Sequence, residues 1–265
     1  MKVSSKVLVV TGAGSGMGRE LTLQLLAKGA HIAAVDISEN GLAETKQLAG
    51  AAANRLSTHL LNIADREQTA RFPEEVIKIH GKVDGLINNA GIIQPFIPIN
   101  ELSYETIDRI MQINFMGTVQ LTKAFLPYLL RRPEAHIANV SSMGGFIPFP
   151  GQSFYGASKA AVKLFTEGLY AELQGTNVQV TIIYPGAVST NIMANSGLEQ
   201  PKTTAAQANR TLSAQQAATI MIRGIEKNKT RILVGPDARM LDMLYRISPS
   251  WAIRFISKQM KKAGR

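Results

Sequence analysis

Tyr155 and Lys159 are the residues whose types and spacing point most directly to chemistry. They lie four positions apart in the segment YGASK, so on a helix they would share one face. An ammonium group beside a phenol favours the phenolate and lowers a pKa that is about 10 in free tyrosine. A tyrosine tuned in this way can take a proton from an alcohol, or return one to a carbonyl, near neutral pH.

Ser142 lies thirteen residues before Tyr155 and follows the apolar run 136–140, which predicts a strand that leads into a loop. A hydroxyl at that place can hydrogen-bond the same reacting oxygen as the tyrosine. The Tyr–Lys spacing alone also fits a tyrosine that packs beside a solvated lysine. The interpretation as a catalytic site therefore depends on support from the elements upstream.

A glycine-rich turn near the N-terminus supplies that support. The apolar run 6–10 predicts a short buried strand, the segment TGAGSGMG follows at 11–18, and an amphipathic helix comes next. Its glycines Gly12, Gly16 and Gly18 have the spacing G-x-x-x-G-x-G. A strand, a glycine-rich turn and a helix in this order aim backbone N–H groups and a helix N-terminus at a phosphate.

Asp36 ends the next predicted strand, 18 residues after Gly18. A carboxylate there can accept hydrogen bonds from both hydroxyls of an adenosine ribose, and it would repel a 2′-phosphate. A basic residue that could bind such a phosphate is absent from two positions near the ribose, because Ser15 precedes Gly16 and Ile37 follows the aspartate. The predicted cofactor is NAD rather than NADP.

Strands and helices continue to alternate along the chain. Further strands are predicted to end near 62, 88, 140, 185 and 235, with helices at about 65–80, 105–130, 154–173 and 213–227. Such alternation predicts an α/β fold with a doubly wound, Rossmann-like parallel sheet covered on both faces. Residues 191–215 are polar and are predicted to form a mobile flap. We expect one domain, with residues 1–235 as its dinucleotide-binding and catalytic part and 236–265 as a helical extension.

Seven motifs stand in order along the chain and together suggest a family. They are TGAGSGMG at 11–18, Asp36 at a strand end, NNAG at 88–91, Asn114, Ser142, YGASK at 155–159 and YPGAVST at 184–190. Through them the chain resembles the short-chain dehydrogenase/reductase family over about residues 5–235. The resemblance implies an oxidoreductase that interconverts an alcohol and a ketone or aldehyde, and a homodimer or homotetramer.

The resemblance also implies catalytic roles. It makes Tyr155 the general acid/base and Ser142 the hydroxyl that orients the substrate oxygen. Lys159 would lower the tyrosine pKa and hold the nicotinamide ribose, and Asn114 would support a water that relays protons to the lysine. Successive residues that leave a strand point in opposite directions, so Ser141 is expected to be structural.

The cofactor contacts implied by the resemblance are spread over the chain. They are Gly12, Ser15, Gly16, Met17, Gly18, Asp36, Asn62, Ile63, Asn89, Ala90, Gly91, Tyr155, Lys159, Pro185, Gly186, Val188 and Thr190. Members of the family usually have an aspartate where Asn62 stands. An asparagine oxygen can also accept from the adenine amino group, so this departure changes little.

Two loops expected at the substrate pocket are unusually apolar. They are GIIQPFIPI at 91–99 and GFIPFPG at 145–151. One interpretation is that Phe96, Ile97, Phe146 and Phe149 pack against other loops or subunits. The other is an apolar pocket with few polar groups, suited to a lipid-like alcohol, ketone or aldehyde.

The composition limits the remaining possibilities. The chain has 265 residues and no cysteine, which excludes disulfides and thiolate metal sites and suits a reducing, cytoplasmic location. The four histidines have no metal-ligand spacing, so no metal site is predicted. The apolar run 7–10 is too short for a signal peptide, and no run of 18 apolar residues predicts a membrane span.

Charge is concentrated at the C-terminus. Residues 221–265 contain eleven Lys or Arg against three acids, so eight of the ten net positive charges lie there. The rest of the chain is nearly neutral, which argues against nucleic-acid binding through the body of the protein. A helix from Trp251 would have a basic stripe, formed by Arg254, Lys258, Lys261 and Arg265 with Lys262 beside it. The opposite side would be apolar, with Ala252, Ile253, Ile256 and Met260. Trp251 and Phe255 would lie at the boundary between the two sides.

Such a basic amphipathic helix has two interpretations. It can bind peripherally at a membrane surface, or it can fold over its own or a neighbouring subunit with solvated lysines. For the whole protein, the leading hypothesis is an NAD(H)-dependent oxidoreductase that acts on a hydrophobic substrate. One alternative is an NADP-dependent 3-oxoacyl thioester reductase, which Asp36 disfavours. Another is a catalytically silent nucleotide-binding scaffold, which the intact set of catalytic residues disfavours.

Overall fold

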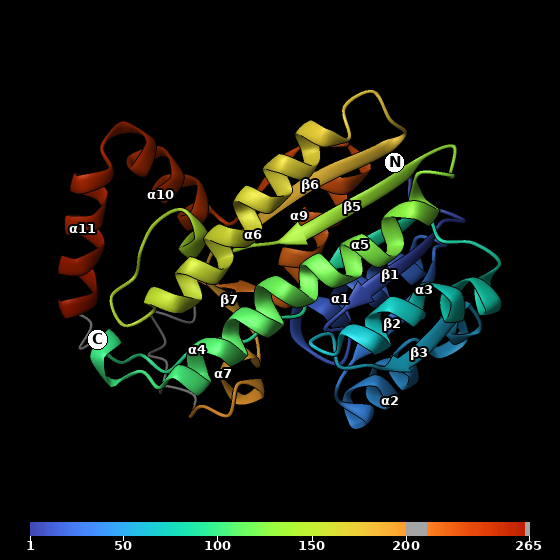
Figure 1. Ribbon diagram of the computed structural model, residues 1–265, viewed down its shortest axis with the longest axis horizontal. Helices are drawn as coiled ribbons and strands as arrows, with labels where there is room; N and C mark the ends of the chain where they lie inside the picture. The colour runs from blue at the N-terminus through green and yellow to red at the C-terminus, as the bar shows by residue number, and fades with distance from the viewer. Residues whose placement is uncertain (200–210, 263–265) are drawn as a thin grey trace.

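Seven parallel strands form one sheet in the computed structural model of the protein, which describes residues 1–199 and 211–262 (Figure 1). In chain order the strands are β1 (Val7–Thr11), β2 (His31–Asp36), β3 (Leu56–Leu60), β4 (Gly85–Asn88), β5 (Ala135–Val140), β6 (Val178–Pro185) and β9 (Arg231–Val234). Their order across the sheet is β3-β2-β1-β4-β5-β6-β9. The strands β1, β4 and β5 are buried at every position, because helices cover both faces.

Helices cover each face of the sheet. One face carries α1 (Gly16–Ala27), α2 (Glu39–Leu48) and α9 (Ala214–Glu226), and the other carries α3 (Arg66–His80), α5 (Gly117–Leu129) and α6 (Ser153–Glu172). Figure 1 shows α5 and α6 in front of the strands and α1 behind them. Leu21 and Met221 are buried in the core of the first face, and Phe72 and Phe125 in the core of the second. The predicted doubly wound parallel sheet is confirmed.

The strand order reverses next to β1, which pairs with β2 on one side and with β4 on the other. In open parallel sheets, ligands bind in the crevice outside the carboxyl ends of the strands at such a switch point. The segments that leave β1, β4 and β5 carry Gly12, Asn89 and Ser142. The topology therefore brings residues from three distant parts of the sequence to one edge of the sheet.

Two segments differ from their predicted form. The stretch 105–130 is not a single α-helix: α4 (Tyr104–Ile110) is followed by a π-helical turn, η3 (Met111–Met116), and then by α5. Within 191–215, the structure has α7 (Ile192–Asn195) and β8 (Leu212–Ser213), and β8 pairs with β7 (Val188–Ser189). The rest of that predicted flap, residues 200–210, lies outside the described residues.

The C-terminal extension forms two helices, α10 (Pro236–Ile247) and α11 (Pro249–Lys262), which pack as a hairpin against the body. Ala252 and Ile256 of α11 are buried in a cluster with Ile147 and Leu241. Ile253, predicted on the apolar stripe opposite the bases, is 37% exposed, whereas Ala252 and Ile256 of the same stripe are buried. Searched over the described residues, the chain contains no helix long and apolar enough to cross a membrane.

Short helical elements complete the fold. They are η1 (Gly50–Arg55), η2 (Ile99–Glu101) and η4 (Met143–Gly145). Side chains cap several of the longer helices: the Asp65 carboxylate accepts from the Glu67 and Gln68 N–H groups at the start of α3. Ser213 and Gln216 form a reciprocal capping box at the start of α9. These caps explain why the two helices begin where the sequence predicts.

Candidate active site

Tyr155 and Ser142 meet beyond the carboxyl end of β5. Tyr155 lies in the first turn of α6, and Ser142 Oγ accepts a hydrogen bond from the Gly144 N–H at 3.0 Å. Burial raises the pKa of the Tyr155 phenol, and a hydrogen bond with the Ser142 side chain opposes that rise. Ser141 makes a structural contact instead, because its buried Oγ donates to the Lys159 carbonyl at 2.7 Å.

Lys159 is buried one turn further along α6. Its Nζ donates to the Val140 carbonyl oxygen at 3.0 Å, and burial lowers its pKa to about 8. In this structure the ammonium binds a β5 carbonyl oxygen and desolvation has the largest influence on the pKa of the Tyr155 phenol, so the effect of Lys159 on that pKa stays a prediction. A pKa of about 8 still leaves Lys159 mostly protonated at neutral pH.

The π-helical turn carries Asn114 to the same place. Its Oδ1 accepts from the Ile92 N–H at 2.8 Å, and its Nδ2 donates to the Ile92 carbonyl at 2.9 Å and to Ser158 Oγ at 3.0 Å. Gly91 separates Asn114 from Lys159: a Cβ there would lie 3.0 Å from Asn114 Oδ1 and 3.1 Å from the lysine Nζ. Helical π-turns occur frequently at functional sites, and this one places a buried amide beside the lysine.

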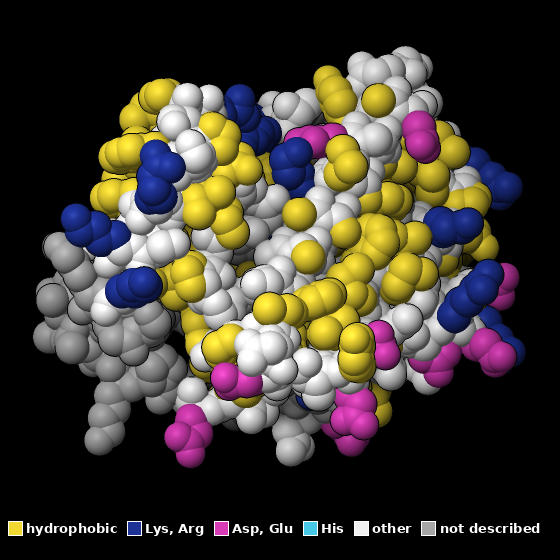
Figure 2. Space-filling model, turned by 60° about the vertical axis from the view of Figure 1, so that its left-hand side comes forward, with side chains coloured by type: hydrophobic (Ala, Val, Ile, Leu, Met, Phe, Trp, Pro, Cys, Tyr) yellow, Lys and Arg dark blue, Asp and Glu magenta, His cyan; other side chains and the backbone are white. Residues whose placement is uncertain are grey.

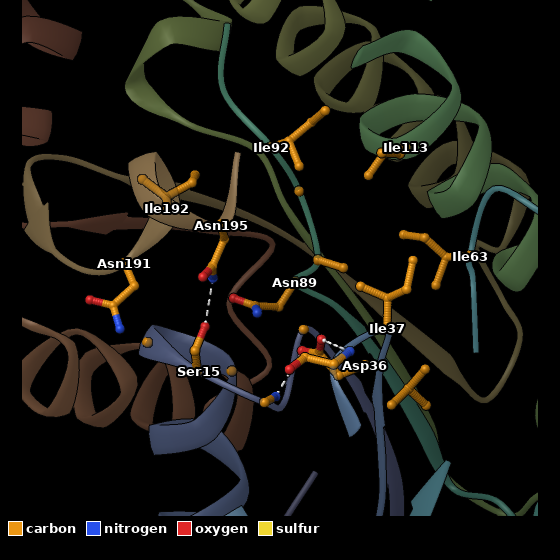
Figure 3. Close-up of a pocket in the computed structure, with 18 of the residues that line it drawn as sticks. Ser15, Asp36, Ile37, Ile63, Asn89, Ile92, Ile113, Asn191, Ile192 and Asn195 are labelled. Carbon is orange, nitrogen blue, oxygen red and sulfur yellow. Dashed lines mark hydrogen bonds between the residues drawn. The ribbon is translucent and has the colours of Figure 1, made fainter. Parts of the chain in front are cut away.

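A cavity of about 340 Å³ lies over the carboxyl ends of β1, β2 and β4 (Figure 3). The predicted cofactor contacts that line it are Gly12, Ser15, Gly16, Met17, Gly18, Asp36, Asn62, Ile63, Asn89, Ala90, Gly91 and Thr190. The other predicted contacts, Tyr155, Lys159, Pro185, Gly186 and Val188, line a second cavity that shares Met17, Asn89, Gly91 and Thr190 with the first. The structure therefore brings the predicted contacts together in two adjoining cavities.

Asp36 is held at the first cavity by two backbone hydrogen bonds (Figure 3). Its Oδ2 accepts from the Gly14 N–H at 2.8 Å, and its Oδ1 accepts from the Ser38 N–H at 2.9 Å. A Cβ at Gly14 would lie 2.9 Å from the Asp36 carboxyl carbon, so the turn approaches the aspartate more closely than a side chain would allow. These contacts fix a negative charge beside the exposed side chain of Ile37.

The glycine-rich turn has the form that a dinucleotide needs. A Cβ at Gly18 would lie 1.9 Å from the Gly12 carbonyl oxygen, so α1 approaches β1 at a distance that only glycine permits. The side chain of Ser15, the residue before α1, makes no capping hydrogen bond to that helix, and the first three residues of the helix, Gly16, Met17 and Gly18, line the cavity. Asn89 Oδ1 is buried without a hydrogen-bond partner among the described residues. These features fit the phosphates and ribose of a dinucleotide.

Sequence reasoning missed several residues of this cavity. Arg109, Ile113, Ile192 and Asn195 also line it, and Asn195 Nδ2 donates to Ser15 Oγ at 2.8 Å (Figure 3). The short helix α7 therefore lies across the glycine-rich turn. Residues 192 and 195 fall in a segment predicted as a flap, and residues 109 and 113 belong to no motif, so the sequence contained no signal for their role.

The second cavity, of about 560 Å³, has mainly apolar walls. Ile93, Phe96, Met143, Phe149, Met193, Ile256 and Met260 contribute apolar side chains, and Gln152 and Gln259 contribute polar ones. Of the two interpretations of the apolar loops, the pocket applies to Phe96 and Phe149. Packing applies to Phe146, whose ring meets that of buried Tyr184 edge-on at a centroid distance of 5.4 Å, and Ile97 does not line the cavity.

Gln94, which the sequence analysis also missed, joins the two apolar loops. Its fully buried side chain accepts from the Tyr155 N–H at 2.8 Å through Oε1 and donates to the Gly151 carbonyl at 2.9 Å through Nε2. Gln152 Nε2 in turn donates to the Gln94 carbonyl at 2.9 Å. One glutamine thus fixes the start of α6 and both walls of the second cavity.

Two of the four histidines, His59 and His136, are buried in this structure. His136 Nε2 lies 2.8 Å from Thr181 Oγ1 inside the sheet, and burial lowers the pKa of His136 to about 3. Burial also lowers the pKa of His59 to about 4. Over residues 1–199 and 211–262, no group of three or more His, Cys, Asp or Glu side chains is arranged to hold a metal ion.

Known proteins share both the sequence and the fold. Residues 6–201 match the family model described as short chain dehydrogenase. A Mycobacterium tuberculosis protein named as oxidoreductase SadH is 37% identical over 265 residues, covering 97% of this chain and 96% of that protein. The 3-oxoacyl-[acyl-carrier-protein] reductase FabG of Thermotoga maritima is 34% identical over 190 residues, covering 72% of this chain and 77% of FabG.

Solved structures share the fold over nearly the whole chain. A short chain dehydrogenase/reductase from Burkholderia phymatum in complex with NAD superposes with a TM-score of 0.85 and 26% identity, covering 95% of this chain and 96% of that one. A short chain dehydrogenase from Burkholderia cenocepacia in complex with NADP gives a TM-score of 0.81 and 25% identity, covering 97% and 99%. Since one family model spans most of the chain and members of that family superpose on nearly all of it, this protein belongs to the short-chain dehydrogenase/reductase family of oxidoreductases.

Proposed function

We propose that the protein is an NAD(H)-dependent oxidoreductase that interconverts an alcohol and a ketone or aldehyde on a hydrophobic, lipid-like substrate. The observation that carries this proposal is the adjacency of the two cavities. The apolar cavity is lined by Ser142, Tyr155 and Lys159, and it shares Asn89 and Gly91 with the dinucleotide cavity. A substrate in the apolar cavity would therefore lie beside a proton-transferring side chain and beside the nicotinamide end of the cofactor.

Tyr155 would move the proton. In the oxidation direction its phenolate removes the hydroxyl proton of the alcohol, and in the reduction direction its phenol gives that proton to the carbonyl oxygen. Ser142, whose side chain hydrogen-bonds the phenol, would hold the same oxygen in place. The nicotinamide, when bound, supplies a hydride acceptor or donor for the substrate carbon, so proton and hydride together account for the two hydrogens of the reaction.

Lys159 and Asn114 would support Tyr155. Lys159 is mostly charged at pH 7, given its pKa of about 8, and that charge favours the phenolate. The Asn114 side chain makes hydrogen bonds to the backbone of Ile92 and to Ser158. It would therefore act by holding the backbone at residues 91–92 against the lysine, in addition to supporting the relay water that the family resemblance implies.

Asp36 supports NAD as the cofactor. Its two hydrogen bonds to backbone N–H groups hold the carboxylate at the dinucleotide cavity, where it can accept from ribose hydroxyls and would repel a 2′-phosphate. The similarity to FabG favours a second candidate, an NADP-dependent 3-oxoacyl thioester reductase. The charge of Asp36 opposes that candidate. The complete set of catalytic side chains opposes a third, the catalytically silent scaffold.

The decisive experiment measures turnover over a chain-length series of secondary alcohols and ketones, with NAD(H) and NADP(H) in parallel and a 3-oxoacyl thioester as a further substrate. We expect kcat/KM with NAD to rise with chain length, because a longer chain buries more surface in the apolar cavity. Turnover of the thioester with NADPH alone would favour the reductase. Binding of NAD without turnover of any of these substrates would favour the scaffold.

Location and assembly complete the proposal. The lack of cysteine suits the cytoplasm, and we propose a homodimer or homotetramer there. Membership of the short-chain dehydrogenase/reductase family supports such an assembly. Analytical ultracentrifugation of the purified protein tests the assembly, and a single species of 28.7 kDa would contradict it.

A further inference from the structure

The hairpin of α10 and α11 has an inner face that belongs to the catalytic body. Ala252 and Ile256 are buried against Ile147 and Leu241, and Ile256 and Met260 line the apolar cavity. One side of α11 therefore forms a wall of the proposed substrate site. The opposite, solvent-facing side of the hairpin is also rich in apolar side chains.

The outer face carries an apolar stripe. Met240, Met243 and Ile247 are 45%, 57% and 75% exposed and follow one another on α10 at the spacing i, i+3, i+7, which places them on one side of the helix. Trp251, 46% exposed at the start of α11, stacks on Phe255 with ring centroids 5.4 Å apart. Exposed apolar side chains that gather in this way, rather than singly, mark an interaction site.

Basic side chains border this stripe. Arg239, Arg246, Arg254, Lys258 and Lys261 are all exposed. The two acids of the hairpin point inward: Asp242 accepts from Arg231 and Arg246, and Asp237 Oδ2 accepts from the Ala187 N–H at 2.6 Å. Figure 2 shows hydrophobic side chains with Lys and Arg side chains among them at the corner formed by the hairpin. The outer face is thus apolar and positively charged at once.

We propose that this outer face docks on the surface of an anionic phospholipid bilayer. The apolar stripe would enter the boundary between headgroups and acyl chains, with Trp251 and the bases at the level of the headgroups. A second copy of the chain fits less well, because two such faces would bring like charges together. The docking does not depend on the proposed reaction. It would place α11, which forms a wall of the apolar cavity, next to the bilayer, where a hydrophobic substrate is concentrated.

The test is co-sedimentation of the full-length protein with two kinds of vesicle, phosphatidylcholine alone and equal parts of phosphatidylcholine and phosphatidylglycerol. We expect binding to the anionic vesicles that weakens as salt is raised, because each base near the surface strengthens binding about fivefold and salt screens that attraction. Absence of binding to anionic vesicles at low salt would overturn the proposal. Equal binding to both vesicles would overturn the electrostatic part.

Variants locate the contact. The pair Met243→Glu/Ile247→Glu should lower the partition coefficient by at least about tenfold, because it removes inserted apolar surface and adds repulsion. The matched pair Leu48→Glu/Ile79→Glu changes two equally exposed apolar residues on α2 and α3 and should bind like wild type. Thermal melts of both pairs exclude unfolding as the cause. The proposal would be refuted if Met243→Glu/Ile247→Glu bound vesicles as well as wild type does. It would also be refuted if wild type did not bind vesicles and this pair of substitutions changed the oligomeric state.

Discussion

Desolvation and charge act in opposite directions on Tyr155. Burial raises the pKa of the phenol, whereas the Ser142 hydroxyl lowers it. Lys159 carries its charge nearby even though its own pKa is depressed to about 8. In the proposed reaction, a phenol kept protonated by burial would favour reduction, and oxidation would require that the neighbouring charge offset the burial. Groups within one turn of α6 and one loop would then set the balance between the two directions.

Tyr155→Phe isolates the proton-transfer step. The change removes only the hydroxyl, so turnover should fall by about 10²–10⁴-fold, the usual contribution of general acid–base catalysis, while NAD binding stays nearly intact. Initial rates and NADH fluorescence titrations measure the two effects. Tyr104→Phe, a tyrosine exposed on α4, serves as the control and should match wild type. Retention of more than about a tenth of the wild-type rate by Tyr155→Phe would end the proposed mechanism.

Asp36→Asn tests whether the charge of Asp36 is responsible for a preference for NAD over NADP. The asparagine keeps the size of the side chain and one oxygen for the Gly14 or Ser38 N–H group, so the turn should fold while the charge is lost. We expect the ratio of kcat/KM for NAD to that for NADP to fall by at least about tenfold, because the repulsion of the 2′-phosphate disappears. Glu39→Gln is the matched control at the start of α2. An unchanged ratio, or equal use of both cofactors by wild type, would show that another group selects the cofactor.

Residue types and spacing were enough to predict which residues of short local motifs lie at the cavities, and the roles of those residues stay predictions. The glycine-rich turn, Asp36 and the Tyr–Lys pair each lie in a short segment, and the structure brings them to the cavities as expected. Gln94 and Asn195 could not be found in this way. Gln94 acts on Gly151, and Asn195 on Ser15, through contacts between segments that are far apart in sequence.

At the scale of elements, hydrophobic patterns located the strands and most helices to within a few residues. The π-helical turn at 111–116 was not predicted, because the packing around a helix, rather than its apolar pattern, decides where i→i+5 bonds replace i→i+4 bonds. The sequence also left open which side of α11 packs on the body. Whether Ile253 is buried depends on how α11 crosses the body, and a helical wheel does not contain that information.

Gly18 and Gly168 provide a matched test of how closely α1 approaches β1. Both lie within α-helices, but a Cβ at Gly18 would lie 1.9 Å from the Gly12 carbonyl oxygen, whereas nothing lies within 4 Å of one at Gly168. Gly18→Ala should therefore destabilise the protein by at least about 2 kcal/mol and abolish NAD binding. Gly168→Ala should stabilise it by about 0.4–1 kcal/mol, since alanine is the better helix former. Urea unfolding measures both, and similar effects of the two changes would refute the close packing.

At the scale of the whole molecule, buried histidines link stability to pH. His136 is neutral in the fold because its pKa is about 3, whereas an unfolded histidine titrates near 6.5. The unfolded state therefore binds more protons below pH 6.5, and stability falls as the pH drops from there towards 3. Because of His136 alone, the free energy of unfolding should be about 2 kcal/mol lower at pH 5 than at pH 7.5. His59 should act in the same direction, because burial lowers its pKa too. Urea unfolding at the two pH values checks this, and equal stability at both would contradict it.

The C-terminal hairpin is the part that the sequence left most open, since packing on the fold and contact with a membrane both suited its pattern. The structure shows that α11 packs on its own subunit, through Ala252 and Ile256, and leaves another face outside. The two interpretations therefore do not exclude each other, because they use different sides of the hairpin. This could not be derived from sequence, as the side of a helix that packs is decided by the surface it meets.

Removing residues 249–265 tests the inner face. The truncation exposes the apolar cluster around Ile147 and Leu241. We therefore expect the free energy of unfolding to fall by roughly 2–3 kcal/mol and the melting temperature to fall by about 5–10 °C. It also removes the cavity wall formed by Ile256 and Met260, so kcat/KM should fall more for long-chain than for short-chain alcohols.

Deleting only residues 263–265 is the control for that truncation, because it leaves α11 as the structure describes it and should change neither property. Differential scanning fluorimetry and the chain-length series measure stability and specificity separately. If the long truncation melts like wild type and keeps the same chain-length profile, α11 is no part of the substrate site. If it melts lower but keeps the profile, α11 only stabilises the body, and the wall of the cavity must come from the loops at 91–99 and 145–151.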